Sequence, residues 1–143
     1  MMRDDTSSIR SQYSFRPTDH GTLIWDVRRL VMLSRDLPRF ELPLSQVAEI
    51  DETFWFAPDG PSPTCRRVAE HARLIADVDL RHPVILSQDG RMMDGMHRVC
   101  KALLDGRKTV TAVRFSQDPE PDYVDVRPED LPYDAPFDPH PAD

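Results

Sequence analysis

Five consecutive residues in the second half of the chain, Asp94-Gly95-Met96-His97-Arg98, combine side chains that could bind a phosphate group. The apolar pattern that follows predicts a helix beginning here. A helix N-terminus attracts anions because its first N–H groups lack intrahelical partners and its macrodipole is positive. Gly95 allows a close approach, Arg98 offers a guanidinium fork suited to phosphate oxygens, and His97 adds a donor that titrates near neutral pH. The pentapeptide predicts an anion site, with Asp94 and His97 as candidate catalytic residues.

Each of these residues also has a purely structural interpretation. Asp94 could be the N-cap of the helix, a role worth about 1 kcal/mol. His97 could be a structural histidine in the first turn. Arg98 could pair with a carboxylate of the C-terminal segment, such as Glu129 or Asp130, which would then lie where a phosphate would lie. The residue types alone leave these alternatives open.

The segments on either side of the pentapeptide predict the elements that position it. Val84-Ile85-Leu86 is a short apolar run, and Asp89-Gly90 is a strong turn signal before Arg91-Met92-Met93, so a β-hairpin is expected. After the turn, Gly106 is placed to end the helix. The alternating, β-branched segment from Thr109 to Phe115 predicts a strand.

Four further elements are expected before the hairpin, and together they predict an α+β fold with a small mixed sheet and helices. Proline or glycine residues mark several of their ends. The elements are a helix from Leu23 to Ser34 capped by Thr22, an edge strand from Phe40 to Leu44, a short helix capped by Ser45, and a helix from Thr64 to about Leu80 with an apolar face at Val68, Ala72, Ile75 and Val78.

The region from about Phe40 to Phe115 resembles the ParB/sulfiredoxin superfamily. The resemblance is carried by Pro83-Val84-Ile85-Leu86, by Asp89-Gly90-Arg91, by Asp94-Gly95-Met96-His97-Arg98 and by Ala102. It implies that a Gly-x-His-Arg turn binds nucleotide phosphates. ATP, ADP or CTP would then contact Gly95, Met96, His97 and Arg98, and the preceding helix would lend polar contacts from Thr64, Arg67 and His71.

The chain departs from the best-known members of that superfamily. Met96 stands where sulfiredoxin has its catalytic cysteine, and a thioether cannot form a thiolate, so sulfiredoxin activity is not expected. The sequence leaves no residues for the separate helix-turn-helix DNA domain of ParB partition proteins. The turn is also similar to that of ParB-like free-serine kinases, which implies phosphoryl transfer to a small molecule. Asp94 is then a candidate Mg²⁺ ligand, and the general base would be Glu49, Asp51 or Glu52.

Charge and composition divide the chain into three parts: a polar leader (1–18), the ParB/sulfiredoxin-like domain (19–117) and an acidic, proline-rich extension (118–143). Residues 116–143 carry nine acidic residues and one base, Arg127, whereas residues 1–115 carry 16 acids and 17 bases. This body is nearly neutral, which argues against nucleic acid as a partner. The extension contains enough apolar residues that we expect it to wrap partly around the domain in extended form.

The alternative function is a non-catalytic interaction or regulatory module. Its Phe54-Trp55-Phe56 loop or its acidic tail would bind a partner protein, and DNA binding or nuclease activity is less favoured. Cys65 and Cys100 lack zinc-ligand spacing and are expected to be small buried hydrophobes in helices. No apolar run is long enough for a membrane span and no signal peptide is evident, so a cytoplasmic location is expected.

Overall fold

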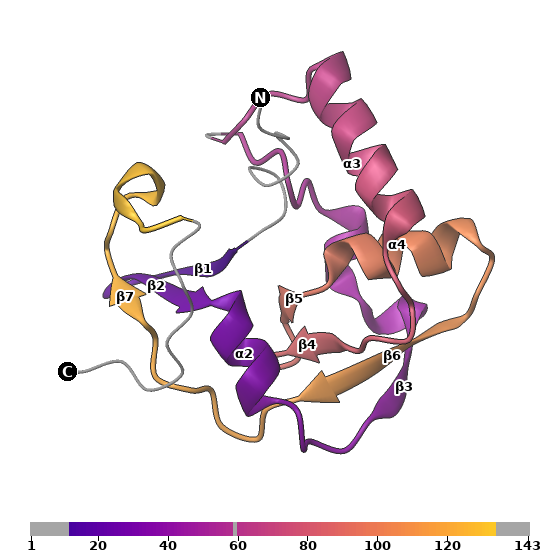
Figure 1. Ribbon diagram of the computed structural model, residues 1–143, viewed down its shortest axis with the longest axis horizontal. Helices are drawn as coiled ribbons and strands as arrows, with labels where there is room; N and C mark the ends of the chain where they lie inside the picture. The colour runs from indigo at the N-terminus through magenta and orange to yellow at the C-terminus, as the bar shows by residue number, and fades with distance from the viewer. Residues whose placement is uncertain (1–11, 59, 134–143) are drawn as a thin grey trace.

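The computed structural model describes residues 12–58 and 60–133, in which two small sheets and three helices form a single α+β unit (Figure 1). This confirms the fold class expected from the sequence. The strands are β1 (Tyr13–Thr18), β2 (Gly21–Asp26), β3 (Phe40–Pro43), β4 (Val84–Leu86), β5 (Met92–Asp94), β6 (Thr109–Arg114) and β7 (Tyr123–Val124). The helices are α2 (Val27–Leu33), α3 (Cys65–Asp77) and α4 (Met96–Leu104), with 3₁₀ turns at Leu44–Gln46, Ala48–Asp51 and Pro128–Asp130.

The larger sheet has the strand order β3-β6-β4-β5 and is mixed, because β4 runs parallel to β6 while the other pairs are antiparallel. Successive side chains of a strand point to opposite faces, so a central strand can bury both. In β4, Val84 and Leu86 join the core under α4, whereas Ile85 joins the core under α2. The expected hairpin is β4 and β5, and the strand expected from Thr109 to Phe115 is β6.

The smaller sheet has the order β1-β2-β7, and α2 lies between the two sheets in Figure 1. The helix expected from Leu23 to Ser34 is wrong in its first half, because residues 21–26 form β2. Pairing with β1 and β7 completely buries Ile24, and the side chain of Asp26 then caps α2 by accepting from the Arg28 N–H at 2.9 Å. Residues 13–18, assigned to the polar leader, form β1.

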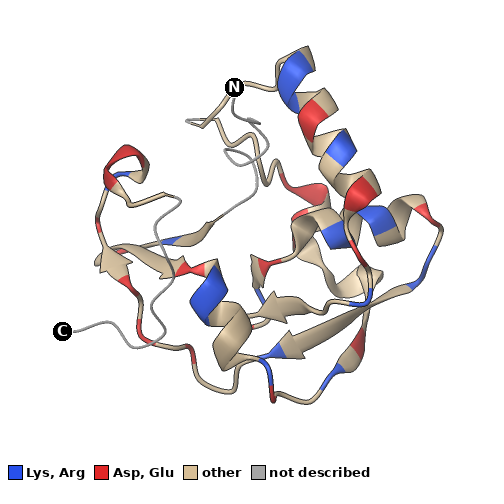
Figure 2. Cartoon of the chain, viewed as in Figure 1, with Lys and Arg blue, Asp and Glu red and all other residues tan. Residues whose placement is uncertain are grey.

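The described part of the C-terminal extension, 118–133, runs along the smaller sheet as expected. Trp25 Nε1 donates to the Pro119 carbonyl at 2.8 Å, and Leu131 is buried against Ile24. Several acidic residues, red in Figure 2, lie along this segment. One of them, Asp118, pairs with Arg16 at 2.7 Å. The remainder of the extension, 134–143, lies outside the described residues.

Helix α3 begins at the expected cap, since Thr64 Oγ1 accepts from the Arg67 N–H at 3.2 Å, but its packed face was predicted wrongly. It buries His71 and Leu74, while Val68 is 51% exposed. Contact with α4 and the aromatic loop selects this side of the helix. It ends at Asp77, before the expected Leu80.

Two smaller expectations are also corrected. Cys65 is exposed at the first position of α3 and Cys100 is only partly buried, so neither thiol is the fully buried hydrophobe predicted. The short helix expected after Ser45 is a pair of 3₁₀ turns separated by Val47, which is buried and extended. Packing of Val47 into the core interrupts the run.

Candidate functional site

The predicted turn joins β5 directly to α4, and its geometry requires glycine. Gly95 has a φ of +114°, and a β-carbon there would lie 2.7 Å from Cγ1 of the fully buried Val84. The Gly95 carbonyl accepts from the N–H groups of Arg98 and Val99, so it starts the helix. Gly95 itself holds the N-cap position with no side-chain cap. The interpretation of Asp94 as the N-cap is therefore wrong.

Asp94 instead forms an ion pair with Arg98, one helical turn away. Arg98 Nη2 lies 3.1 Å from Asp94 Oδ2 and 3.2 Å from the Pro83 carbonyl oxygen. Both side chains are largely buried, and burial raises the pKa of Asp94 while the neighbouring guanidinium acts in the opposite direction. Arg98 Nε is buried and has no hydrogen-bond partner among the described residues.

The alternative in which Arg98 pairs with Glu129 or Asp130 is not found in the structure. Glu129 and Asp130 both lie beside Arg127, at 3.6 and 2.9 Å. Asp94 lies four residues from Arg98, and Asp130 lies three residues from Arg127. Pairs this close in the sequence need no ordering of distant segments, which favours both of them. Glu129 and Asp130 therefore do not occupy the predicted phosphate position.

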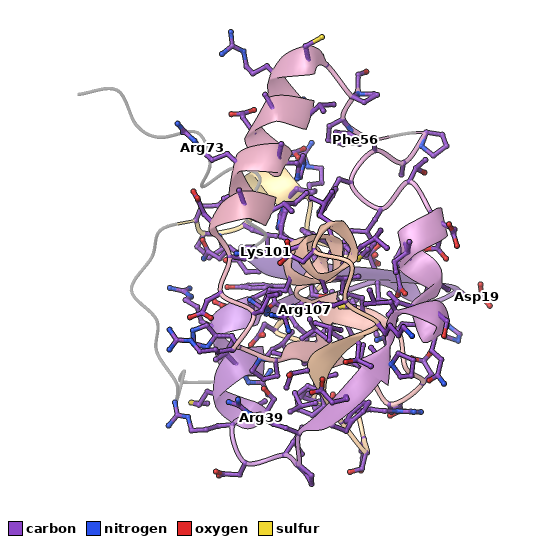
Figure 3. All side chains as sticks on the ribbon, turned by 90° about the vertical axis from the view of Figure 1, so that its right-hand side faces the viewer. Asp19, Arg39, Phe56, Arg73, Lys101 and Arg107 are labelled. Carbon is purple, nitrogen blue, oxygen red and sulfur yellow. The ribbon has the colours of Figure 1, made fainter. Side chains whose placement is uncertain are left out.

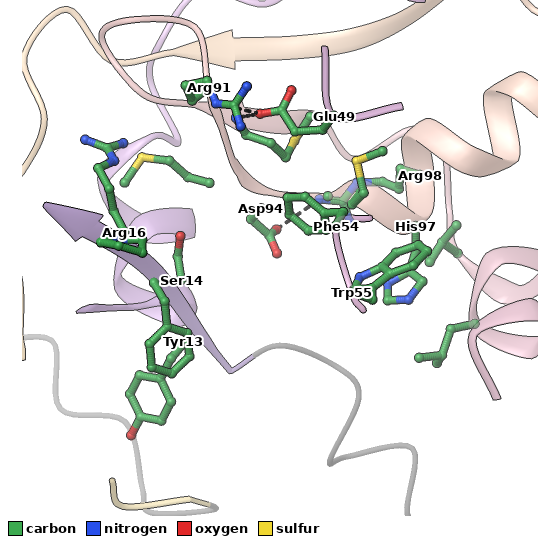
Figure 4. A pocket seen from close by; sticks show the side chains of 18 of the residues that line it. Tyr13, Ser14, Arg16, Glu49, Phe54, Trp55, Arg91, Asp94, His97 and Arg98 are labelled. Atoms are coloured by element: carbon green, nitrogen blue, oxygen red, sulfur yellow. Dashed lines mark hydrogen bonds and ion pairs between the residues drawn. The ribbon is translucent and has the colours of Figure 1, made fainter. Parts of the chain in front are cut away.

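A histidine pair covered by a tryptophan adjoins the turn, and Figure 4 shows two of the three rings, Trp55 and His97. His71 Nδ1 of α3 lies 2.9 Å from His97 Nε2 of α4. The Trp55 indole stacks on both imidazoles, with centroid distances of 4.3 Å to His71 and 4.5 Å to His97. Burial lowers the pKa of His71, and the charge of Arg67 lowers it further. The pair is thus held as stacked imidazoles of which His71 favours the neutral form.

A cavity of about 960 Å³ opens between β1 and the β5–α4 turn. Figure 4 shows Arg16 on the strand side, opposite Asp94 and His97. The cavity wall combines cations and carboxylates with aromatic and thioether groups. Its charged residues are Arg16, Arg91 and Arg98, together with Glu49, Asp89 and Asp94.

Glu49 is the one candidate general base that lines this cavity. It is 3% exposed, and its Oε2 accepts from the Met92 N–H at 2.8 Å and lies 3.3 Å from Arg91 Nε. Arg91 also binds Glu52 through two hydrogen bonds, which lowers the pKa of Glu52. Asp51 and Glu52 are exposed outside the cavity wall.

The structure brings together some of the predicted binding residues and leaves others apart. Gly95, Met96, His97 and Arg98 line the cavity, and His71 contacts His97 from behind it. Thr64 and Arg67 are exposed at the start of α3 and do not line the cavity. Helix α3 extends away from the turn, so only its second half reaches α4 (Figure 1).

Sequence reasoning missed three contributors to the site. Arg16 was placed in the leader, although its neighbours alternate in a strand pattern that could have revealed it. Trp55 was assigned to a loop that would bind a partner protein, not to a contact with the histidines. Arg91 was noted only as part of the hairpin. Each reaches the cavity through contacts between segments distant in the sequence.

Comparison with protein-family models finds no match, and comparisons with curated proteins and with solved structures find none either. The ParB/sulfiredoxin resemblance therefore rests on the residues quoted for it. In the described part of the chain, no helix is long and apolar enough to cross a membrane. Nor do these residues contain three or more His, Cys, Asp or Glu side chains grouped to hold a metal ion.

Proposed function

We propose that the chain binds a nucleoside polyphosphate, ATP, ADP or CTP, with its phosphates at the Gly95 turn. The observation that supports this most strongly is that the N-terminus of α4 adjoins a cavity lined by His97 and Arg98. At about 960 Å³ the cavity is within the upper range for small-molecule sites. Met96 would contribute its backbone N–H, as the first residue of the helix.

Arg98 has donors to offer a phosphate while keeping its present contacts. Only Nη2 is engaged with Asp94 and Pro83, and Nε lacks an acceptor in the described residues. A phosphate oxygen at Nε would remove the cost of a buried, unsatisfied donor, about 1–3 kcal/mol. Thr64 and Arg67 would contact only parts of the nucleotide that project from the cavity.

Phosphoryl transfer to a small-molecule hydroxyl is the reaction we propose for this site. The acceptor oxygen would bond to the terminal phosphorus as the bond to the bridging oxygen breaks, and the hydroxyl proton would pass to a base. Glu49 is the best-placed base, because it lines the cavity and only its Oε2 is bonded within the described residues. His97 would donate to the phosphates.

Asp94 would be the protein ligand for Mg²⁺ carried by the nucleotide. One carboxylate is enough, because Mg²⁺ in such sites is held mainly by phosphates and water. Oδ2 pairs with Arg98, and Oδ1 makes no hydrogen bond in the described residues. Bound Mg²⁺ would neutralise phosphate charge.

Calorimetric titration with ATP, ADP and CTP, each with Mg²⁺, tests the proposal. At least one nucleotide should bind, and Arg98→Lys, which keeps the charge but loses the fork, should weaken binding at least about tenfold. Arg107→Ala is the matched control, because Arg107 is exposed and outside the cavity wall. Failure of all three nucleotides to bind the wild-type chain would overturn the proposal.

The alternative is a non-catalytic interaction module, and the exposure of Phe54 favours it. Phe54 is 43% exposed at the cavity, next to the stacked Trp55. The described part of the acidic extension lends it less support, because Asp118 is engaged with Arg16. Nucleotide-independent binding to a partner that Phe54→Ala abolishes, with Arg98→Lys unaffected, would establish this function instead.

A further inference from the structure

A second cavity, of about 210 Å³, shares Asp94 and Arg98 with the first. Its other walls come from α2, from the segment before β3, and from β4 and β6. The two cavities thus meet at the buried ion pair. The nucleotide proposal uses Asp94 and Arg98 but none of the other residues that line the second cavity.

The inner wall of the second cavity is apolar. Ile85 and Val113 are almost completely buried at its base, and Val31 of α2 lines it from the side. Val31 is 50% exposed, so its side chain leaves apolar surface at the cavity. A ligand with an apolar body would remove this surface from water, which is favourable in proportion to the apolar area covered.

The remaining wall is cationic. Arg35 and Arg39 line the cavity and form no ion pair with a carboxylate in the described part of the chain. Arg39 Nη1 donates only to the Arg81 carbonyl, at 3.2 Å. Asp94 is the one carboxylate in the wall, and Arg98 already pairs with it. The cavity therefore carries an excess of positive charge beside an apolar base.

We propose that the second cavity binds a small organic carboxylate. Its carboxylate group would lie between Arg35 and Arg39, whose planar forks match the geometry of carboxylate oxygens. Its apolar body would cover Val31, Ile85 and Val113. A whole nucleotide exceeds this volume, and inorganic phosphate would leave polar oxygens against the apolar base, which is costly.

Methyl-detected NMR titration of the full chain with benzoate tests this assignment. Saturable shifts should be confined to methyl groups around the cavity, including those of Val31, Ile85 and Val113. A ligand of this size should bind with a dissociation constant of about a millimolar. Benzamide, the neutral isostere, should bind at least about tenfold more weakly because it lacks the charge.

Substitutions at the rim separate charge recognition from simple apolar contact. Arg39→Ala should weaken benzoate binding about tenfold or more, and Arg35→Ala should do the same. Both residues are exposed, so the methyl spectrum of each free variant should retain the wild-type dispersion. Arg107→Ala removes the same charge at a separate place on the surface and should leave the affinity unchanged (Figure 3).

Three results would overturn the assignment. One is the absence of saturable benzoate shifts at the cavity methyl groups. Another is equal binding of benzamide, or indifference to both rim substitutions, which would leave only an apolar pocket. The third is inorganic phosphate displacing benzoate with higher affinity, which would make the site a simple anion site.

Discussion

Gly95→Ala, at the start of α4, should destabilise the chain more than Gly106→Ala, just beyond the end of the same helix. Both glycines have positive φ, +114° at Gly95 and +73° at Gly106. A β-carbon at Gly106 would meet nothing within 4 Å. At Gly95 it would lie 2.7 and 2.9 Å from two atoms of buried Val84. The pair of variants therefore separates backbone strain from steric overlap.

The expected magnitudes follow from these distances and angles. The φ of Gly106 is close to the left-handed helical region, where an L-residue costs about 1–2 kcal/mol. The φ of Gly95 is farther from the left-handed helical region, so an alanine there would be strained by about 1–3 kcal/mol. Overlap of its β-carbon with the packed core would add about 1–3 kcal/mol. The total for Gly95→Ala is thus about 2–6 kcal/mol. Each alanine also reduces the entropy of the unfolded chain, which stabilises both variants equally, so this contribution cancels when the two are compared.

Urea unfolding followed by circular dichroism measures the difference directly. With wild type as reference, the free energy of unfolding should fall at least about 1 kcal/mol further for Gly95→Ala than for Gly106→Ala. Thermal midpoints should differ in the same order, by roughly 3 °C or more. If Gly95→Ala proved as stable as Gly106→Ala, the close approach of the turn to Val84 would be refuted.

Three further predictions concern the elements around the turn. Thr64→Ala should lower the free energy of unfolding by about 1 kcal/mol, because it removes the N-cap of α3. Thr64→Ser keeps the hydroxyl and should retain most of the wild-type stability, so equal losses in the two variants would contradict the cap. Burial, reinforced by Arg67, lowers the pKa of His71 from 6.5, so the unfolded chain binds more protons as pH falls below about 6.5. The free energy of unfolding should therefore fall as the pH decreases from about 6.5 toward the folded-state pKa of His71. The urea midpoint should fall between about pH 7.5 and pH 5.5, and it should fall less in His71→Asn than in the wild-type chain. A chain ending at Gln117 should lose at least about 2 kcal/mol, because Leu131 alone buries a full side chain, and unchanged urea stability would show that the extension does not stabilise the domain.

The hairpin, the turn and α4 were predictable from sequence because local backbone chemistry determines them. Gly90, Gly95 and Gly106 all have positive φ, and each stands where the sequence signals placed a turn or a helix end. The alternating, β-branched pattern of Thr109 to Phe115 likewise predicted a strand, and in β6 Val110 and Ala112 are buried on one face. Such signals depend only on neighbours within a few residues, so they can be recognised in the sequence without knowing the tertiary structure.

The strand β2 could not be distinguished from a helix in the same way. Leu23, Ile24 and Val27 also fit a helical period, and the choice was made by pairing with β1 and with β7, about 100 residues away in sequence. The packed face of α3 was likewise decided by contact. His71 was counted as polar, yet stacking with Trp55 and its bond to His97 make it part of the interior.

The sequence by itself determined the chemical character of the site: a glycine that opens a helix, followed by a histidine and an arginine. Tertiary structure decided which groups face that turn. Arg16 comes from a strand of the other sheet, Glu49 from a 3₁₀ turn, and the partner of Arg98 proved to be Asp94. Residue types set what each group can do, but only packing of distant segments sets the distances at which they act.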